Sequence, residues 1–372
     1  MNFDFSDNQR EIQAQVRRVL EATCTDATLR AAADGRSLMG KEAWDELAAI
    51  GALGAAIPEA YGGSGLGRLE LCLVAEEVGR ANAPAPVSSS IYLAAEALLA
   101  AGSPAQKSAW LPRLAAGEAI GTLAHAGQAP GIGSRAPELT MRRGVVAGVA
   151  TAVPDGQTAT MAVLAVRDDD AGGATSLALV DLQASGVSRT ATSSIDPTRP
   201  RATITFADAP AELVGVPGRG EATLAKVLQR AAILLAFEQI GGAQRCLDMA
   251  RDYALQRYAF GRVIGSYQAI KHKLADVYAR NRMALAHAYY GGWALATDAE
   301  TPLAAAAARV SASEAFNFAA QENIQTHGGI GFTWEHPCHL LYRRARALSL
   351  ELGAPHEWRE IIADQLATAA AA

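Results

Sequence analysis

RYAFGRVIGSYQAIKHKLAD, residues 257–276, interrupts a long apolar helical pattern, and the interpretation of the whole chain starts from it. Phe260 and Gly261 break the first helix, so an arginine, an aromatic ring and glycines meet at a corner between two predicted helices. A guanidinium can pair with a diphosphate through two parallel hydrogen bonds, and glycines let the backbone approach a ligand closely. The corner is therefore either a diphosphate site with Arg257 as its cation or an ordinary turn that carries a surface arginine.

The helix after this corner has its own start signal. Ser266 is placed to cap it, and the helix is predicted to begin near Tyr267. Gln268 follows early in this helix, where its side-chain amide offers both a donor and an acceptor to a polar group of a cofactor.

A second stretch, QTHGGIGFTWEHPCHLLYRRAR at residues 325–346, favours the binding alternative. Together the two stretches resemble the RxxFG…Q…LAD and QxxGGxGF…E.P…LYR signatures of the acyl-CoA dehydrogenase family. Residues 58–65, PEAYGGSG, and residues 76–81, EEVGRA, are further matches. The four motifs occur in the expected order and the resemblance covers nearly the whole chain, so we expect the fold of that family.

The resemblance also implies a reaction and its partners. In the family a carboxylate takes the α proton of an acyl-CoA thioester, the β hydrogen leaves as hydride to FAD, and electrons pass to an electron-transfer flavoprotein. The residues that the resemblance assigns to FAD, across a subunit boundary, are Arg257, Phe260 and Gln268, with Gln325, Gly328 and Gly329 near its adenine end. A cofactor site of this kind implies at least a dimer, and we expect a homo- or hetero-oligomer such as a dimer of dimers.

Local patterns divide the chain into three regions. Residues 1–118 show helical periodicity, with start signals such as Ser103 followed by proline. Residues 119–217 are richer in Gly, Val and Thr and contain short strand-like runs, and residues 218–372 return to long helices with short connections. We predict a mostly α protein with a central β domain: an N-terminal helical domain, a middle β-barrel or sheet domain, and a C-terminal four-helix bundle.

Composition excludes several functional classes. The chain has 33 basic and 38 acidic side chains, a net charge of −5, and its basic residues are scattered, which does not indicate nucleic-acid binding. No apolar run is long enough to cross a bilayer, and the N-terminus lacks a signal-peptide core, so we expect a cytoplasmic protein. The four cysteines show no metal or redox spacing, and we predict no metal site. The histidines considered for metal, and set aside because their spacing matches no metal signature, are His272, His327, His336 and His339.

The middle region departs from the family pattern. Most members place a T-E-P-x-A-G-S-D-like stretch and a W-x-T-like stretch against the flavin. Their counterparts here are HAGQAPGIGS at 125–134, without the acidic and Thr positions, and GVATAVPDG at 148–156, without the Trp and the usual Thr. These departures, with DPTRP at 196–200 and TWEH at 333–336, resemble a divergent bacterial subgroup. Some of its members work as pairs of unlike subunits on bulky acyl-CoA substrates, including steroid side chains.

The two positions that carry the catalytic base in the family hold residues that cannot accept a proton. One position lies ten residues after Tyr342, which gives Leu352. The other lies thirteen residues before Gln244, which gives Ala231. The base must therefore be another residue of this chain or belong to another chain.

Two carboxylates near these positions are candidates for the base. Glu238 lies two helical turns after the second position and follows an apolar run, where desolvation raises a carboxyl pKa, and we rank it first. Glu351 adjoins the first position and ranks second. The alternative for Glu238 is an ion pair with an arginine that only holds the bundle together. For the whole chain, the alternatives to a dehydrogenase are a non-catalytic or FAD-completing subunit and a flavin oxidase or monooxygenase.

Overall fold

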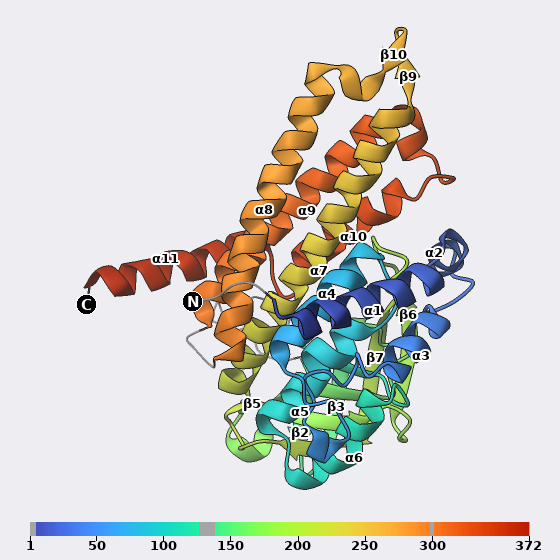
Figure 1. The fold of residues 1–372 in the computed structure, drawn as a ribbon. Helices are drawn as coiled ribbons and strands as arrows, with labels where there is room; N and C mark the ends of the chain where they lie inside the picture. Colours follow the sequence, from blue (N-terminus) through green and yellow to red (C-terminus); the bar gives the residue numbers. More distant parts are fainter. Residues whose placement is uncertain (1–4, 126–137, 298–300, 372) are drawn as a thin grey trace.

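Three regions follow one another along the chain in the predicted order, helical, β and helical (Figure 1). The computed structural model describes residues 5–125, 138–297 and 301–371. The predicted fold class, mostly α with a central β domain, is confirmed. The boundaries at residues 118 and 217 stay predictions. No helix in the described ranges combines the length and the apolar character that crossing a membrane would need.

Two of the N-terminal helices begin at a capping box, one of them at the predicted Ser103. Ser6 and Gln9 form a reciprocal capping box, and Ser103 and Gln106 form another directly before Pro104. The elements of this region are α1 (Asp7–Thr23), α2 (Asp26–Ala33), α3 (Lys41–Ala49), η1 (Glu59–Tyr61), α4 (Arg68–Arg80), η2 (Ser88–Ala95), α5 (Glu96–Ala101) and α6 (Pro104–Ala115).

The described strands of the middle region form one mixed sheet with the order β6-β7-β3-β2-β4-β5-β8, and β1 pairs with β4. Two of the pairs, β1 with β4 and β2 with β4, are parallel. The strands are β1 (Gly121–Ala124), β2 (Thr140–Arg142), β3 (Val145–Pro154), β4 (Met161–Asp168), β5 (Ala174–Asp181), β6 (Val187–Thr192), β7 (Arg201–Pro210) and β8 (Glu212–Val214). β4 is buried on both faces over most of its length, so the sheet is covered on both sides there.

The long helices α7 (Gly220–Gln256), α8 (Gln268–Ala296) and α9 (Pro302–His327) pack against one another, as predicted for a bundle (Figure 1). The short η5 (Gly328–Phe332) ends α9, and α10 (Cys338–Leu350) and α11 (Pro355–Ala371) then contact it. We did not predict α10 from the sequence. Its buried residues recur at helical spacing and include Cys338, Leu341, Ala345 and Leu348. The family motif overlaps this stretch and hides the periodicity.

The corner at residues 257–267 is a small hairpin beyond the end of the bundle (Figure 1). β9 (Tyr258–Ala259) and β10 (Arg262–Val263) are joined by Phe260 and Gly261, which have φ angles of 53° and 81°. Positive φ at both central residues is the geometry of a two-residue hairpin turn. The prediction that Ser266 caps α8 is wrong, because its hydroxyl donates to the carbonyl of Val263 and the helix begins at Gln268 without a side-chain cap.

The helices α4 and α7 cross with backbone against backbone. A Cβ atom at Gly79 would lie 1.7 Å from the carbonyl oxygen of Glu238, and one at Gly241 would lie 1.8 Å from that of Glu76. No side chain fits at either glycine. This crossing gives the EEVGRA motif a structural role, since its glycine brings the N-terminal helices onto the bundle.

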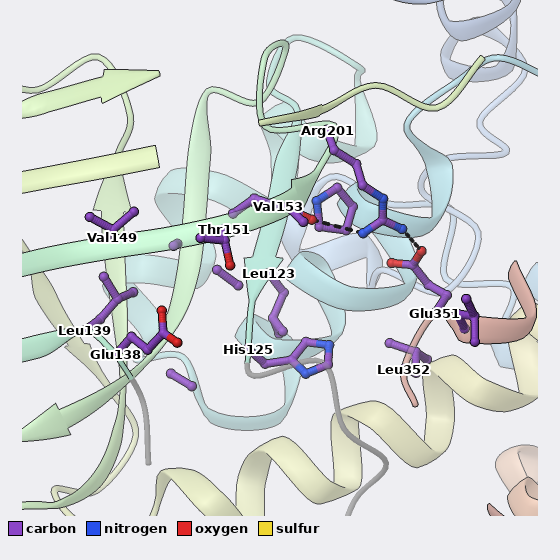
Figure 2. A pocket seen from close by; sticks show the side chains of 16 residues that line it. Leu123, His125, Glu138, Leu139, Val149, Thr151, Val153, Arg201, Glu351 and Leu352 are labelled. Carbon is purple, nitrogen blue, oxygen red and sulfur yellow. Dashed lines mark hydrogen bonds and ion pairs between the residues drawn. The ribbon is translucent and has the colours of Figure 1, made fainter. Parts of the chain in front are cut away.

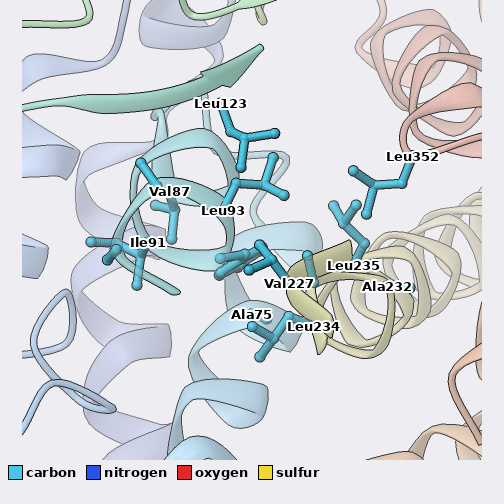
Figure 3. Packing of buried hydrophobic residues seen from close by; sticks show 14 of the residues in the cluster. Ala75, Val87, Ile91, Leu93, Leu123, Val227, Ala232, Leu234, Leu235 and Leu352 are labelled. Carbon is cyan, nitrogen blue, oxygen red and sulfur yellow. The ribbon is translucent and has the colours of Figure 1, made fainter. Parts of the chain in front are cut away.

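Apolar side chains from all three regions share one core (Figure 3). Leu93 of η2 and Leu123 of β1 belong to it together with Leu235 of α7, and Leu352 from the loop after α10 lies beside Leu235. The loop after α10 is therefore anchored to the part of the molecule where the sheet meets the bundle.

Candidate active site

A cavity of about 260 Å³ lies between the middle sheet and the loop after α10 (Figure 2). Its walls include His125 after β1, residues 149–154 of β3, Arg201 at the start of β7, and residues 350–352. His125 and residues 149–154 belong to the counterparts of the two stretches that face the flavin in the family. Residues 350–352 include Leu352, at one of the family's two base positions. Of the stretch 125–134, residues 126–134 lie outside the described residues.

An irregularity in β3 shapes one wall of this cavity. The register of β3 against β7 shifts between Ala150 and Val153, and Ala152 has a φ of 52°. Bulges of this kind bend a strand and re-aim its side chains. The Ala152 carbonyl accepts a hydrogen bond of 2.9 Å from Nη1 of Arg201, and Nη2 of Arg201 forms an ion pair with Glu351 (Figure 2). Arg201 thus connects the bulge to the loop after α10.

The imidazole of His125 faces the same space (Figure 2). Burial lowers the pKa of His125 to about 4, although the nearby Glu351 carboxylate acts in the opposite direction. The ring is therefore neutral at pH 7 and can serve as a donor or an acceptor but not as a cation.

Glu238, the first-ranked candidate for the base, does not line the cavity. It lies in the middle of α7 with no exposed surface. Its Oε1 accepts from Nη1 of Arg199 at 3.1 Å and from Nη1 of Arg344 at 3.4 Å. This arrangement matches the structural alternative for Glu238, in which the carboxylate forms an ion pair that holds the bundle together. The ion pair involves two arginines, where we expected one.

The charges around Glu238 join all three regions. Arg344 of α10 pairs with Asp196 and donates to the backbone of Ala83 at 3.2 Å. Arg199 donates to the hydroxyl of Ser88 in η2. Burial lowers the pKa of Arg199, but the surrounding carboxylates, Glu238 foremost, more than offset this effect and raise the pKa overall. The DPTRP stretch, which we read as a mark of a subgroup, supplies a buried charge cluster.

Glu351 is the candidate base that lies on the cavity wall. The neighbouring base position is apolar, since Leu352 is 2% exposed and packs into the shared core (Figure 3). Ala231, at the other base position, is fully buried in α7. Of the two candidates, only Glu351 lies on the cavity wall, and which carboxylate accepts the proton stays a prediction.

The six residues expected at FAD lie away from this cavity, and none of them lines it. Phe260 is in the turn of the hairpin at the far end of the bundle from the sheet, Arg257 directly precedes the hairpin, and Gln268 begins α8 after it (Figure 1). Gln325, Gly328 and Gly329 lie at the end of α9. Both sets of motif residues lie at the same end of the bundle, because α7 contacts α9 there. The ring centroids of Tyr253 in α7 and His327 in α9 are 4.3 Å apart.

The six motif residues are exposed or face open space within this chain, which leaves them free to contact a ligand or a second chain. Phe260 is 97% exposed, which is unusual for an aromatic side chain. Gly328 has a φ of 62°, and a Cβ atom at Gly328 or Gly329 would meet no other atom of this chain. Arg257 and Gln268 are exposed. The guanidinium of Arg257 can donate to a diphosphate, and the side-chain amide of Gln268 can donate to a polar group of the cofactor. The residues present therefore fit FAD.

Comparison with known proteins agrees with this architecture. Residues 6–118 match the model described as acyl-CoA dehydrogenase, N-terminal domain, and residues 218–367 match acyl-CoA dehydrogenase, C-terminal domain. The chain belongs to the acyl-CoA dehydrogenase family. The function of this family is FAD-dependent dehydrogenation of acyl-CoA, an oxidoreductase reaction on a CH–CH group.

Several relatives of this acyl-CoA dehydrogenase family member cover most of its length. It is 36% identical to the acyl-CoA dehydrogenase IpdE2 of Mycobacterium tuberculosis over 83% of this chain and 81% of that protein. It is similar to the structure named Tcur3481-Tcur3483 steroid ACAD G363A variant, with 29% identity, a TM-score of 0.87, and coverage of 98% and 99%. It is also similar to the ChsE4-ChsE5 complex from Mycobacterium tuberculosis, with 26% identity, a TM-score of 0.89, and coverage of 99% of both chains.

One histidine cluster sits beside the family's glycine motif. Ligand atoms of His327, His336 and Cys338 lie within 4.8 Å of one another. Nδ1 of His327 also lies 2.8 Å from the Asn323 carbonyl, which it can reach as a donor. Burial raises the pKa of the Cys338 thiol to about 12, so it is protonated at pH 7. These groups are neutral when no cation is bound, and the absence of a metal site stays a prediction.

Arg201 and Glu138 also line the cavity, and no motif of the sequence marks either of them as a functional residue. Arg201 is the first residue of β7, and nothing in the sequence around it shows that it reaches a glutamate 150 positions away. Their assignment needed the fold, because the acyl-CoA dehydrogenase motifs lie elsewhere in the chain.

Proposed function

We propose that this chain is a subunit of an FAD-dependent acyl-CoA α,β-dehydrogenase that passes its electrons to an electron-transfer flavoprotein. The observation that carries the proposal is the convergence of β3, His125 and the loop after α10 on one cavity. FAD, when bound, supplies the acceptor for the β hydrogen. The chain's own residues then have to hold the thioester, exclude water and accept the α proton.

Glu351 is the proposed acceptor of the α proton. Its carboxylate is held at the cavity by Arg201, whose side chain is 24% exposed, while the carboxylate side chain is 11% exposed. To accept the proton, the carboxylate turns from the guanidinium toward the α carbon, and Arg201 keeps its second contact with Ala152. Neutral His125 can orient polar groups of the substrate without adding charge.

We also propose that the complete FAD site is formed by two chains. The cavity and the six motif residues lie at separate places on one chain, so a second chain is needed to bring the two halves to one cofactor (Figure 1). An unlike partner and a bulky acyl group are supported by similar structures whose names give two components or a steroid.

A second candidate function is supported by a specific observation. Both usual base positions are apolar and buried, at Leu352 and Ala231, and Glu238 is held by two arginines. In this second candidate the chain completes the FAD site of a partner that supplies the base. The two candidates differ in whether a carboxylate of this chain is needed for turnover.

The test uses the protein expressed alone and together with candidate unlike subunits. We expect denaturation to release free FAD, and anaerobic addition of an acyl-CoA from a panel of straight-chain and steroid-like thioesters to bleach the flavin. Rapid oxygen consumption instead of electron transfer to the flavoprotein would indicate an oxidase. A colourless preparation that takes up no FAD with any partner would refute the proposal. Full turnover in both Glu351→Gln and Glu238→Gln would move the base to the partner.

A further inference from the structure

Arg309 is a fully buried arginine whose purpose the cavity does not explain. It lies in α9, is 1% exposed and does not line the cavity. Among the described residues no carboxylate forms an ion pair with it, and burial lowers the pKa of its guanidinium to about 10. Burying a charge without an ion-pair partner is costly, so the hydrogen bonds it makes must have a structural use.

Its hydrogen bonds point in two directions. Nη1 donates to Oε1 of Gln239 at 2.7 Å and to the hydroxyl of Ser313 at 2.9 Å, which fixes the guanidinium between α7 and α9. Nη2 donates to the backbone carbonyls of Leu348 and Glu351. The planar fork of the guanidinium can satisfy both sides at once.

The two carbonyls belong to the end of α10 and to the loop that follows it. A helix leaves its last carbonyls without partners, and here α10 stops at Leu350, so the Leu348 carbonyl has no amide one turn later. Leu352 then adopts a φ of 59°, a conformation unfavourable for a leucine. On the other side of the loop, Nε1 of Trp358 donates to the Leu352 carbonyl at 3.1 Å. The loop backbone is thus held from both sides by buried side chains.

We propose that Arg309 is a positioning residue, which fixes the backbone of residues 348–352 and so sets where Glu351 and Leu352 meet the cavity. The inference rests on the proposed function for its effect on turnover, but not for its effect on the loop. Arg309 touches neither the cavity nor, in the proposed chemistry, the reacting atoms. A displacement of a catalytic group by about 1 Å can lower the rate about 100-fold.

The test compares Arg309→Met, which removes every donor, with Arg309→Lys and with the matched control Ser313→Ala. Ser313 contacts the same guanidinium, but its removal leaves both loop carbonyls bonded. In the assembled holoenzyme, with ferrocenium as acceptor and the acyl-CoA identified by the panel, we expect R309M to lower kcat about 10- to 100-fold with KM changed less than twofold. R309K should recover part of kcat, and S313A should stay near wild type.

Hydrogen exchange of residues 348–354 gives a readout that does not depend on turnover. Exchange in this segment should be faster in R309M, intermediate in R309K and unchanged in S313A, with the middle of α9 protected in all three. If R309M fails to fold, the comparison of R309K with S313A makes the same distinction. Unchanged exchange in the segment would overturn the inference. A wild-type protein with no dehydrogenase activity but the expected exchange pattern would refute the proposed function and leave the positioning role standing.

Discussion

Glu238→Gln separates the two roles that the sequence allows for Glu238. The side chain has no exposed surface and lies between the guanidinium groups of Arg199 and Arg344. Removing its charge leaves two buried cations with less compensation, and breaking a buried ion pair costs about 3–5 kcal/mol. Because the unfolding entropy is about 2.1 cal/mol/K per residue, or about 0.8 kcal/mol/K for 372 residues, the melting temperature should fall by about 4–6 °C.

The assay pairs thermal unfolding with turnover and FAD content, and Glu351→Gln is the comparison. We expect E238Q to melt at lower temperature yet keep FAD and most of its turnover at 25 °C. E351Q should lose a smaller amount of stability, because its ion pair is partly exposed, and should lose about 10²–10⁴-fold in turnover if Glu351 is the base. Unchanged melting of E238Q together with loss of its turnover would refute our reasoning and return Glu238 to first place.

Three further predictions concern packing, the cofactor and pH. Gly79→Ala should destabilise the protein by about 3 kcal/mol or more in urea unfolding, because its Cβ would lie 1.7 Å from a carbonyl oxygen of α7; wild-type stability would contradict the crossing geometry. Arg257→Ala should lower the FAD content per subunit without changing the melting temperature of the apoprotein, as absorbance after gel filtration would show, because this side chain is exposed. Burial, assisted by Glu77, raises the pKa of Glu76 to about 7, above the value near 4.5 of an unfolded chain. The stability linked to Glu76 is therefore complete below about pH 4.5 and is lost as the pH rises through 7, so Glu76→Gln should flatten the decline between pH 5 and pH 8.

The fold could be predicted from the sequence because its signals are local. Caps such as Ser103, glycines that stop helices, and motifs in a known order each act over a few residues. The errors also have local causes. Ser266 looks like a cap, but a two-residue hairpin precedes it, and the turn uses its hydroxyl on Val263 instead. The helix α10 is not predicted because the motif at residues 325–346 overlaps most of it and hides its helical periodicity.

Site residues could be predicted from the sequence only where all the residues that serve one function lie within a single motif. The glycines and polar residues of the FAD motifs are recognisable because backbone approach and hydrogen bonding need particular residue types. The base is different, since its identity depends on which carboxylate faces the cavity. The apolar run before Glu238 ranks it above Glu351 in the sequence, but the sequence does not show that Arg199 and Arg344 pair with Glu238 while Arg201 holds Glu351 at the cavity.

The backbone contact between α4 and α7 also bears on how this protein can be divided. Gly79 and Gly241 each face a carbonyl oxygen of the opposite helix, so the surfaces match only when both helices are present. An isolated fragment covering residues 1–118 would expose to water the face of α4 that packs against α7. A fragment covering residues 218–372 would lack Arg199, one of the two ion-pair partners of Glu238. Because the three stretches share one core and this helix contact, we expect them to unfold together as one cooperative unit. We therefore expect limited proteolysis between them to yield a nicked but assembled molecule rather than stable pieces.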